Sequence, residues 1–256
     1  MCALKATLCL LTHNRVEETV QTIKSIRRFG EFDFELSIAD QGSDAQSKQA
    51  FRDMADVFTE VSDRELWEYG FGAAKQKAVD LASNDWIVHA DPGEVWHENL
   101  IDFAPNISGL IQNQRKSCLA FRIMRGDPAL VRQVVHQQIK SVVLNDDNGR
   151  VFRKSMMHFR GLIHEAPMHK ATGQLWAEWA RGFKPVAWVE HAGPSADDAV
   201  FKERKRVLYA HLISKIVENP QLRLGTDPYW WTTYWNEQIE PTFKKVSFEQ
   251  WQALGG

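Results

Sequence analysis

The chain has 256 residues, 44% of them hydrophobic and 25% charged, which is the composition of a globular protein with one sizeable core. The formal net charge of −2 argues against a surface built to bind a polyanion, and no apolar run is long enough to span a bilayer. Three scattered cysteines, Cys2, Cys9 and Cys118, suggest a reducing compartment and lack the CxxC spacing of a cysteine-bound zinc site.

The first third of the chain alternates between strand and helix patterns. Ala6–Thr12 is a short apolar run that predicts a buried strand, and helical spacing of apolar residues predicts a helix over Val16–Phe29. Further strands are expected at Phe34–Ala39, Val57–Val61 and Trp86–Ala90, and further helices at Asp44–Ala55 and Gly72–Ala82. This alternation predicts an α/β fold with a largely parallel sheet flanked by helices.

Polar side chains stand where several of these strands end. Thr12 and Asn14 close the first strand, Asp40 closes the second, and Asp91 and Glu94 close the fourth. Because ligands of parallel sheets bind at the carboxyl ends of the strands, these residues predict a ligand site along one edge of the sheet.

The remainder of the chain is less regular. Strand patterns occur at Cys118–Met124, Ser141–Leu144, Val151–Lys154 and Lys184–Val189, a long helix is expected over Ala196–Glu218, and an aromatic cluster spans Tyr229–Trp235. We expect one domain over residues 1–195, with a ligand-binding half at 1–95 and a second half at 96–195. A helical extension follows at 196–256.

Asp91 and Glu94 have the chemistry of a cation site. Mg²⁺ and Mn²⁺ favour carboxylate oxygens together with the phosphates of a substrate. A turn-forming role for Asp91 is the alternative. The sequence does not support a phosphate loop, a nucleophile elbow or a zinc-protease site, because it has no GxxxxGK[ST], no GxSxG and no HExxH motif.

Several segments together resemble glycosyltransferase family 2, in order and suitably spaced over about residues 5–195. They are Leu11–Arg15, Ile38–Asp44, Tyr69–Lys75, Asp85–Glu94, Val151–Lys154 and Phe159–Glu165. The last two resemble one branch of the family, with an FRG-x-IHE-like segment. The resemblance implies a GT-A fold, in which residues 1–95 bind the nucleotide sugar and residues 96–195 form the acceptor half. It also implies transfer of a sugar from a nucleotide-diphosphate donor with inversion.

The resemblance also implies roles for individual residues. Glu165 would be the catalytic base that takes the acceptor proton, for which a carboxylate is well suited; a capping or salt-bridging glutamate is the alternative. Asp40 would contact the nucleotide base of the donor. Donor-binding roles fall on Thr12, Asn14, Arg15, Asp40, Lys75, Asp91 and Arg153. Metal-ligating roles fall on Asp91, Glu94, His164 and His191.

One departure from the family pattern concerns the metal. Gly93 occupies the place of the second aspartate of the DxD motif, which is normally the metal ligand. Either Glu94 replaces it as a ligand of Mn²⁺ or Mg²⁺, or cations such as Arg15, Lys75 or Arg153 stabilise the leaving diphosphate.

We therefore predict a cytoplasmic glycosyltransferase, hexosyl or related, with a nucleotide sugar as donor. A non-catalytic module that binds a nucleotide sugar or carbohydrate, and a nucleotidyltransferase, are the competing interpretations. The acceptor stays open among a glycan, a lipid-linked sugar, a protein and a modified DNA base. No transmembrane segment is expected, and peripheral contact with a membrane stays open.

Overall fold

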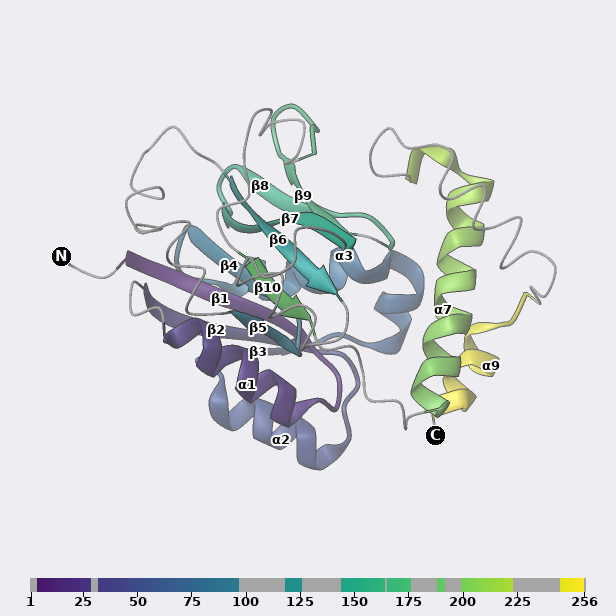
Figure 1. Ribbon diagram of the computed structural model, residues 1–256. Helices are drawn as coiled ribbons and strands as arrows, with labels where there is room; N and C mark the ends of the chain where they lie inside the picture. Colours follow the sequence, from purple (N-terminus) through teal and green to yellow (C-terminus); the bar gives the residue numbers. More distant parts are fainter. Residues whose placement is uncertain are drawn as a thin grey trace.

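The computed structural model describes residues 4–28, 32–96, 118–125, 144–163, 165–175, 188–191, 199–222 and 245–255 (Figure 1). The strands are β1 (Leu4–Thr12), β2 (Phe32–Asp40), β3 (Val57–Glu60), β4 (Trp86–Ala90), β5 (Glu94–Trp96), β6 (Cys118–Arg125), β7 (Leu144–Arg153), β8 (Met157–Arg160), β9 (Ala166–His169) and β10 (Trp188–His191). The helices are α1 (Val16–Arg27), α2 (Ala45–Met54), α3 (Asp63–Leu81), α7 (Ala199–Glu218) and α9 (Phe248–Gln252), with short 3₁₀ turns at Pro220–Leu222 and Ala253–Gly255.

Eight of these strands form one sheet in the order β3-β2-β1-β4-β7-β6-β10-β5. β3, β2, β1 and β4 are parallel, and β7 joins β4 antiparallel. Thr12 pairs with Asp40 and Leu10 with Ala90, so β1, β2 and β4 end at the same edge. The predicted α/β fold, and the predicted grouping of polar residues at one edge of the sheet, are confirmed.

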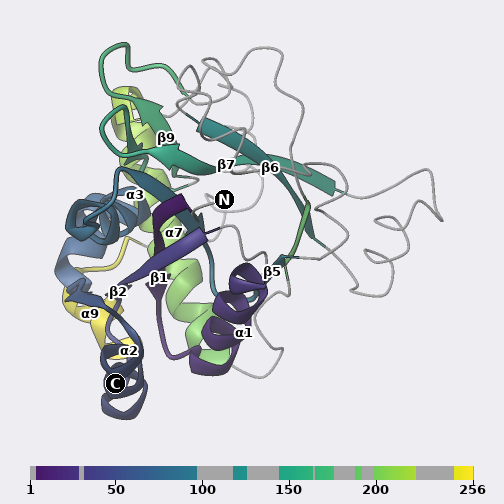
Figure 2. The same ribbon diagram turned by 90° about the vertical axis from the view of Figure 1, so that its left-hand side faces the viewer.

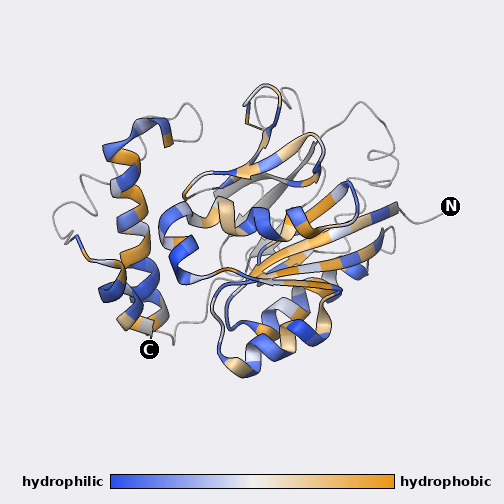
Figure 3. Ribbon diagram, turned by 180° about the vertical axis from the view of Figure 1, so that it is seen from behind, coloured by the Kyte–Doolittle hydropathy of each residue, from blue (hydrophilic) through white to orange (hydrophobic). Residues whose placement is uncertain are grey.

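The alternation of side chains along β1 divides the core between the two faces of the sheet. Leu8 and Leu10 pack on one face with apolar residues of α1 and α2. Cys9 and Leu11 pack on the other face, where residues of α3, α7 and α9 cover them. Figure 2 shows α1 and α3 on opposite sides of the strands, and Figure 3 shows the apolar residues concentrated on the strands between them.

The structure corrects several expected boundaries. α3 begins at Asp63, well before the predicted Gly72, because Ser62 and Glu65 form a capping box at its start and the helix continues through a kink at Gly70. β7 is one strand where two were expected, and β5 and the β8–β9 hairpin were not predicted. The aromatic cluster Tyr229–Trp235 lies outside the described residues.

The C-terminal elements share the core of the sheet. The buried Trp251 of α9 donates its indole N–H to the carbonyl of Arg204 in α7 at 3.0 Å. Trp67 of α3 stacks on His211 of α7 with 3.6 Å between ring centroids and also contacts Trp251. None of the described helices has the length and apolar character needed to cross a membrane.

Candidate functional site

The turns after β1 and β2 are tied together by their own polar side chains. Asp40 is fully buried and accepts hydrogen bonds from the backbone N–H and the hydroxyl of Ser43, with Thr12 Oγ1 at 3.4 Å. Asn14 adopts a left-handed φ of 52°, and its side chain accepts the N–H of Asp44 at 2.7 Å. The structure therefore brings these residues together: Thr12 contacts Asp40 directly, and Asn14 joins them through Ser43, whose hydroxyl accepts the N–H of Asn14 at 2.9 Å.

A pocket opens beside these turns. His13 and Gln41, which directly follow β1 and β2, line it from the sheet, and the remaining walls include Phe71, Arg204, Lys205 and Trp251. It combines aromatic faces with cationic side chains, a combination suited to an aromatic anionic ligand.

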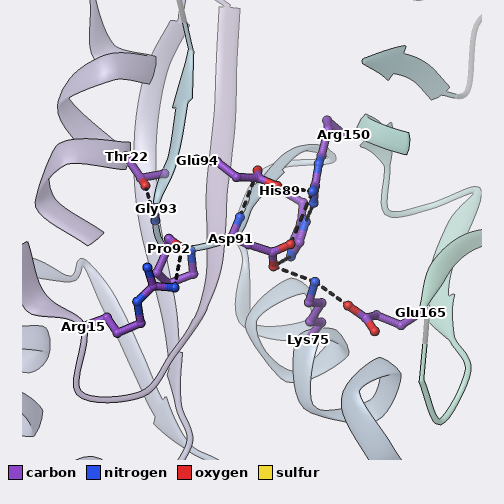
Figure 4. Close-up of polar contacts among 10 residues, drawn as sticks. All are labelled: Arg15, Thr22, Lys75, His89, Asp91, Pro92, Gly93, Glu94, Arg150 and Glu165. Atoms are coloured by element: carbon purple, nitrogen blue, oxygen red, sulfur yellow. Dashed lines mark hydrogen bonds and ion pairs between the residues drawn. The ribbon is translucent and has the colours of Figure 1, made fainter. Parts of the chain in front are cut away.

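The turn after β4 is held from α1. The N–H of Gly93, at a φ of 91°, binds Thr22 Oγ1 at 3.0 Å, and Arg15 Nη1 donates to the carbonyl of Pro92 at 2.9 Å (Figure 4). Ser25 of α1 accepts the N–H of Trp96 at 3.0 Å, which fixes β5 as well. α1 therefore sets the position of Asp91 and Glu94 at the sheet edge.

Lys75 joins the predicted base to the predicted donor-binding carboxylate. Its Nζ lies 2.6 Å from Asp91 Oδ1 and 2.5 Å from Glu165 Oε1 (Figure 4). Burial disfavours the charged form of Lys75, but the attraction of Asp91 and Glu165 outweighs this effect and raises the pKa of Lys75. Burial likewise acts against the charge on Asp91, yet Lys75 and Arg150 hold its pKa well below the ordinary value. Two of the predicted site residues, 16 and 90 positions from Lys75, thus meet at one ammonium group.

Glu165 reaches this place through a close backbone contact. The N–H groups of Phe71 and Gly72, just past the kink of α3, donate to the carbonyls of Leu162 and Gly161 at 2.9 Å each. Gly70 and Gly72 have no room for a Cβ there, since one would lie 2.3 Å and 2.5 Å from those carbonyl oxygens. The glycines therefore allow α3 to dock the segment that leads to Glu165.

Arg150 is a site residue that the sequence did not reveal. Its Nη2 binds Glu94 Oε1 and lies 3.3 Å from Asp91 Oδ2, and its Nη1 lies 2.7 Å from His89 Nδ1. Only 2% of the Arg150 side chain and none of the Glu94 side chain is exposed. Burial raises the pKa of Glu94 to about 7 against the attraction of Arg150. Burial, followed by the charge of Lys75, lowers the pKa of His89, so that its neutral Nδ1 accepts from Arg150.

The structure gathers some predicted residues and separates others. Arg153 stacks over Trp86 and lies 3.9 Å from Asp85, at the opposite end of β4 from Asp91. Strand pairing explains this separation, because β7 runs antiparallel to β4 and places Arg150, not Arg153, beside His89. His164 lies outside the described residues, and only the backbone of His191 in β10 is described. Their predicted metal-ligating roles stay predictions.

The carboxylates at this edge do not fit a divalent cation as they stand. All four oxygens of Asp91 and Glu94 have donors, because Glu94 Oε2 also accepts the N–H of Asp91 at 3.1 Å. Within the described parts of the chain, no three His, Cys, Asp or Glu side chains are grouped to hold a metal ion. What the arrangement offers is a partly exposed carboxylate, Glu165, beside a fixed cluster of two cations.

Comparison with known families gives one match over most of the chain. The model of the family described as glycosyl transferase family 2 matches residues 7–161, which is more than half of the chain. The match ends at Gly161, so the likeness of the segment that leads to Glu165 is not part of it. No matching relative was found among curated proteins.

Three of the solved structures that match this chain are glycosyl-transfer or nucleotide-bound proteins by their descriptions. A mannosyltransferase from Pyrobaculum calidifontis with GDP-Man and Mn²⁺ is 13% identical with a TM-score of 0.46, over 100% of this chain and 80% of that one. Glucosyl-3-phosphoglycerate synthase from Mycobacterium tuberculosis, with Mn²⁺, UDP-glucose and phosphoglyceric acid, is 16% identical with a TM-score of 0.43, over 83% and 79%. S. aureus TarS 1–349 with UDP is 15% identical with a TM-score of 0.37, over 49% of this chain and 37% of that one. Similarity at this level does not indicate a shared substrate.

Proposed function

Because this chain belongs to glycosyltransferase family 2, we propose that it transfers a sugar from a nucleotide-diphosphate sugar to an acceptor hydroxyl group, with inversion at the anomeric carbon. The observation that carries the proposal is the Glu165–Lys75–Asp91 chain of ion pairs. It joins a carboxylate with 15% of its side chain exposed to the edge of the sheet where ligands of such folds bind.

In the proposed reaction, the acceptor oxygen attacks the anomeric carbon from the face opposite the diphosphate. The new carbon–oxygen bond forms as the bond to the diphosphate breaks, and Glu165 receives the proton of the acceptor hydroxyl. The bonding electrons leave with the nucleoside diphosphate, whose growing charge needs cations close by. Lys75 holds Glu165 in place and supplies one of these cations.

The pocket beside the turns after β1 and β2 supports a place for the nucleotide. Phe71 offers an aromatic face for a base, and Lys205 and Arg204 carry positive charge, with Arg204 also paired with Asp63. Asp40, the residue expected to contact the base, is engaged with Ser43 and would have to exchange that contact. Under this proposal, α7 and α9 of the expected extension 196–256 contribute to the donor site.

The remaining parts of the proposal rest on sequence alone. A cytoplasmic location is in keeping with the buried free thiol of Cys9. The acceptor is any of the classes named above, a glycan, a lipid-linked sugar, a protein or a modified DNA base. Membership of the family favours sugar transfer over nucleotidyl transfer.

Donor binding is tested by thermal unfolding against a panel of UDP-, GDP-, dTDP- and CMP-sugars. A donor present at about 100 times its Kd adds roughly 2.7 kcal/mol to stability. For a chain of this size that is a rise in Tm of roughly 5–11 °C. We expect one nucleotide to stand out from the panel. The absence of a shift with every donor would refute the proposal.

The catalytic role of Glu165 is tested by Glu165→Gln once a donor is known. We expect donor binding to persist while release of the nucleoside diphosphate, with or without an added acceptor, falls by about 10²–10⁴-fold, the usual contribution of a general base. Glu60→Gln is the matched control, because Glu60 is exposed and pairs only with Lys48 and Arg52 of α2 among the described contacts. Equal loss in both variants would contradict the assignment.

A non-catalytic module that binds a nucleotide sugar is the second candidate. It is favoured by Gly93 in the place of the usual aspartate. A donor that binds tightly and is not turned over by the wild-type protein with any acceptor class would support it.

A further inference from the structure

Two carboxylates at the sheet edge are already neutralised by side chains. Asp91 binds Lys75 through Oδ1 and Arg150 through Oδ2, and Glu94 binds Arg150 through Oε1. A divalent cation bound by both carboxylates needs the same oxygens at about 2.0–2.6 Å. It would therefore have to occupy the space that the guanidinium of Arg150 fills.

Arg150 is held there by the fold itself. Val151 pairs with Val88 in the antiparallel β4–β7 ladder, which brings Arg150, the residue before Val151, beside His89. The neutral imidazole of His89 accepts a third contact from Arg150 at 2.7 Å. Only 2% of the Arg150 side chain and none of the Glu94 side chain is exposed. Withdrawing the guanidinium would therefore leave the buried Glu94 without a counter-ion.

Gly93 stands where the family pattern has the second aspartate, so this position offers no carboxylate to a metal. Its φ of 91° lies in the region that favours glycine, and its N–H is fixed by Thr22. Arg15, which binds the carbonyl of the neighbouring Pro92, brings a further cation to this turn. Its Nη2 is buried and has no hydrogen-bond partner among the described residues. That nitrogen is therefore an unsatisfied donor close to the turn after β4.

From these contacts we propose that Arg150 is a built-in counter-ion of Asp91 and Glu94 that takes the place of a divalent metal. The donor diphosphate then binds without Mn²⁺ or Mg²⁺, contacting Arg15 and Lys75. This inference rests on the proposed function, because it concerns the diphosphate of the same donor. Arg150 is a positioning residue, since it is too buried to reach the substrate. Glu94 holds Arg150 in place and is not a metal ligand.

The wild-type protein tests the metal requirement directly. Thermal unfolding is followed with MnCl₂ alone, and with the donor panel in MnCl₂ or in EDTA. We expect no shift with MnCl₂ alone and the same donor shift in both media. A donor shift that disappears in EDTA would overturn the inference and leave the proposed function standing. If no donor binds in either medium, the proposed function fails, and the response to MnCl₂ alone still decides whether Arg150 excludes the metal.

Arg150→Met gives the converse test. Removing the guanidinium frees Asp91 and Glu94, so Mn²⁺ affinity, measured by titration of the free-ion EPR signal, should rise by about tenfold or more, the scale on which groups around a metal site alter affinity. Arg52→Met removes the same charge from an exposed pair with Glu60 and should leave Mn²⁺ affinity unchanged. A folded Arg150→Met protein with no gain in Mn²⁺ affinity would overturn the inference.

Glu94→Gln serves if Arg150→Met does not fold, because the amide oxygen still accepts from Arg150. If Glu94 serves only as a partner of Arg150, the rise in Tm caused by the donor should remain in this variant and should be equal in MnCl₂ and in EDTA. A loss of Mn²⁺ affinity in this variant relative to wild type would show that Glu94 is a metal ligand, contrary to the inference.

Discussion

Replacing Gly72 by alanine should destabilise the protein although alanine is the better helix former. Gly72 lies in α3, and a Cβ at this position would lie 2.5 Å from the carbonyl oxygen of Gly161 and 2.8 Å from the carbonyl carbon of Arg160. Both atoms belong to the backbone, so no side-chain rotation relieves the clash. The facing segment would have to withdraw by about 1 Å to restore ordinary contact distances.

The expected cost follows from the contacts that this withdrawal breaks. The hydrogen bonds from Phe71 N–H and Gly72 N–H contribute about 1 kcal/mol each. Overpacking of a tight contact adds about 1–3 kcal/mol. Alanine returns about 0.5–1 kcal/mol through its helix propensity. The net loss is about 2–4 kcal/mol, or roughly 5–15 °C in Tm for a chain of this size.

Urea unfolding followed by tryptophan fluorescence measures this loss, with Gly173→Ala as the control. Gly173 has a φ of 69° and no atom within 4 Å of an added Cβ, so it loses only about 1–2 kcal/mol from backbone strain. Backbone propensity alone ranks the two variants in the opposite order, with Gly72→Ala neutral or stabilised. A Gly72→Ala protein as stable as wild type would refute the docking of α3 onto the segment that carries Glu165.

Two further predictions concern the C-terminal elements. Trp251→Ala should lower the free energy of unfolding by about 3–5 kcal/mol, because a buried indole that also binds the carbonyl of Arg204 is lost. Urea unfolding measures this loss. A loss below about 1 kcal/mol would show that α9 is not docked on α7. Burial and the charge of Lys215 lower the pKa of His211 to about 4, so the unfolded chain binds the proton first and stability falls as pH drops from about 6.5 toward 4. His211→Phe keeps the stacking on Trp67 and should lose less stability over that range in thermal unfolding; an identical pH dependence in both proteins would contradict the low pKa.

Local patterns were sufficient for much of the architecture. β4 was predicted with its observed bounds, and β1, β2, α1 and α2 were predicted within a few residues, because each shows its apolar period within a short stretch of sequence. The kink in α3 and the long β7 were misjudged. In α3, glycines interrupt the apolar period of the helix although the helix continues. In β7, polar residues separate two apolar stretches although the strand pairing continues.

The sequence by itself determined which residues end the parallel strands, and so placed Thr12, Asp40 and Asp91 at one edge. The parallel direction of these strands follows from the local alternation of strand and helix, which is why that inference succeeded. Only the tertiary structure decided what those groups contact. The antiparallel register of β7 on β4 brings Arg150 to Asp91 and Glu94 and leaves Arg153 at the far end, and the docking of α3 brings Lys75 to Glu165. Such pairings join residues far apart in the chain, and a one-residue change in register would reverse which side chain faces the site, so no local pattern encodes them.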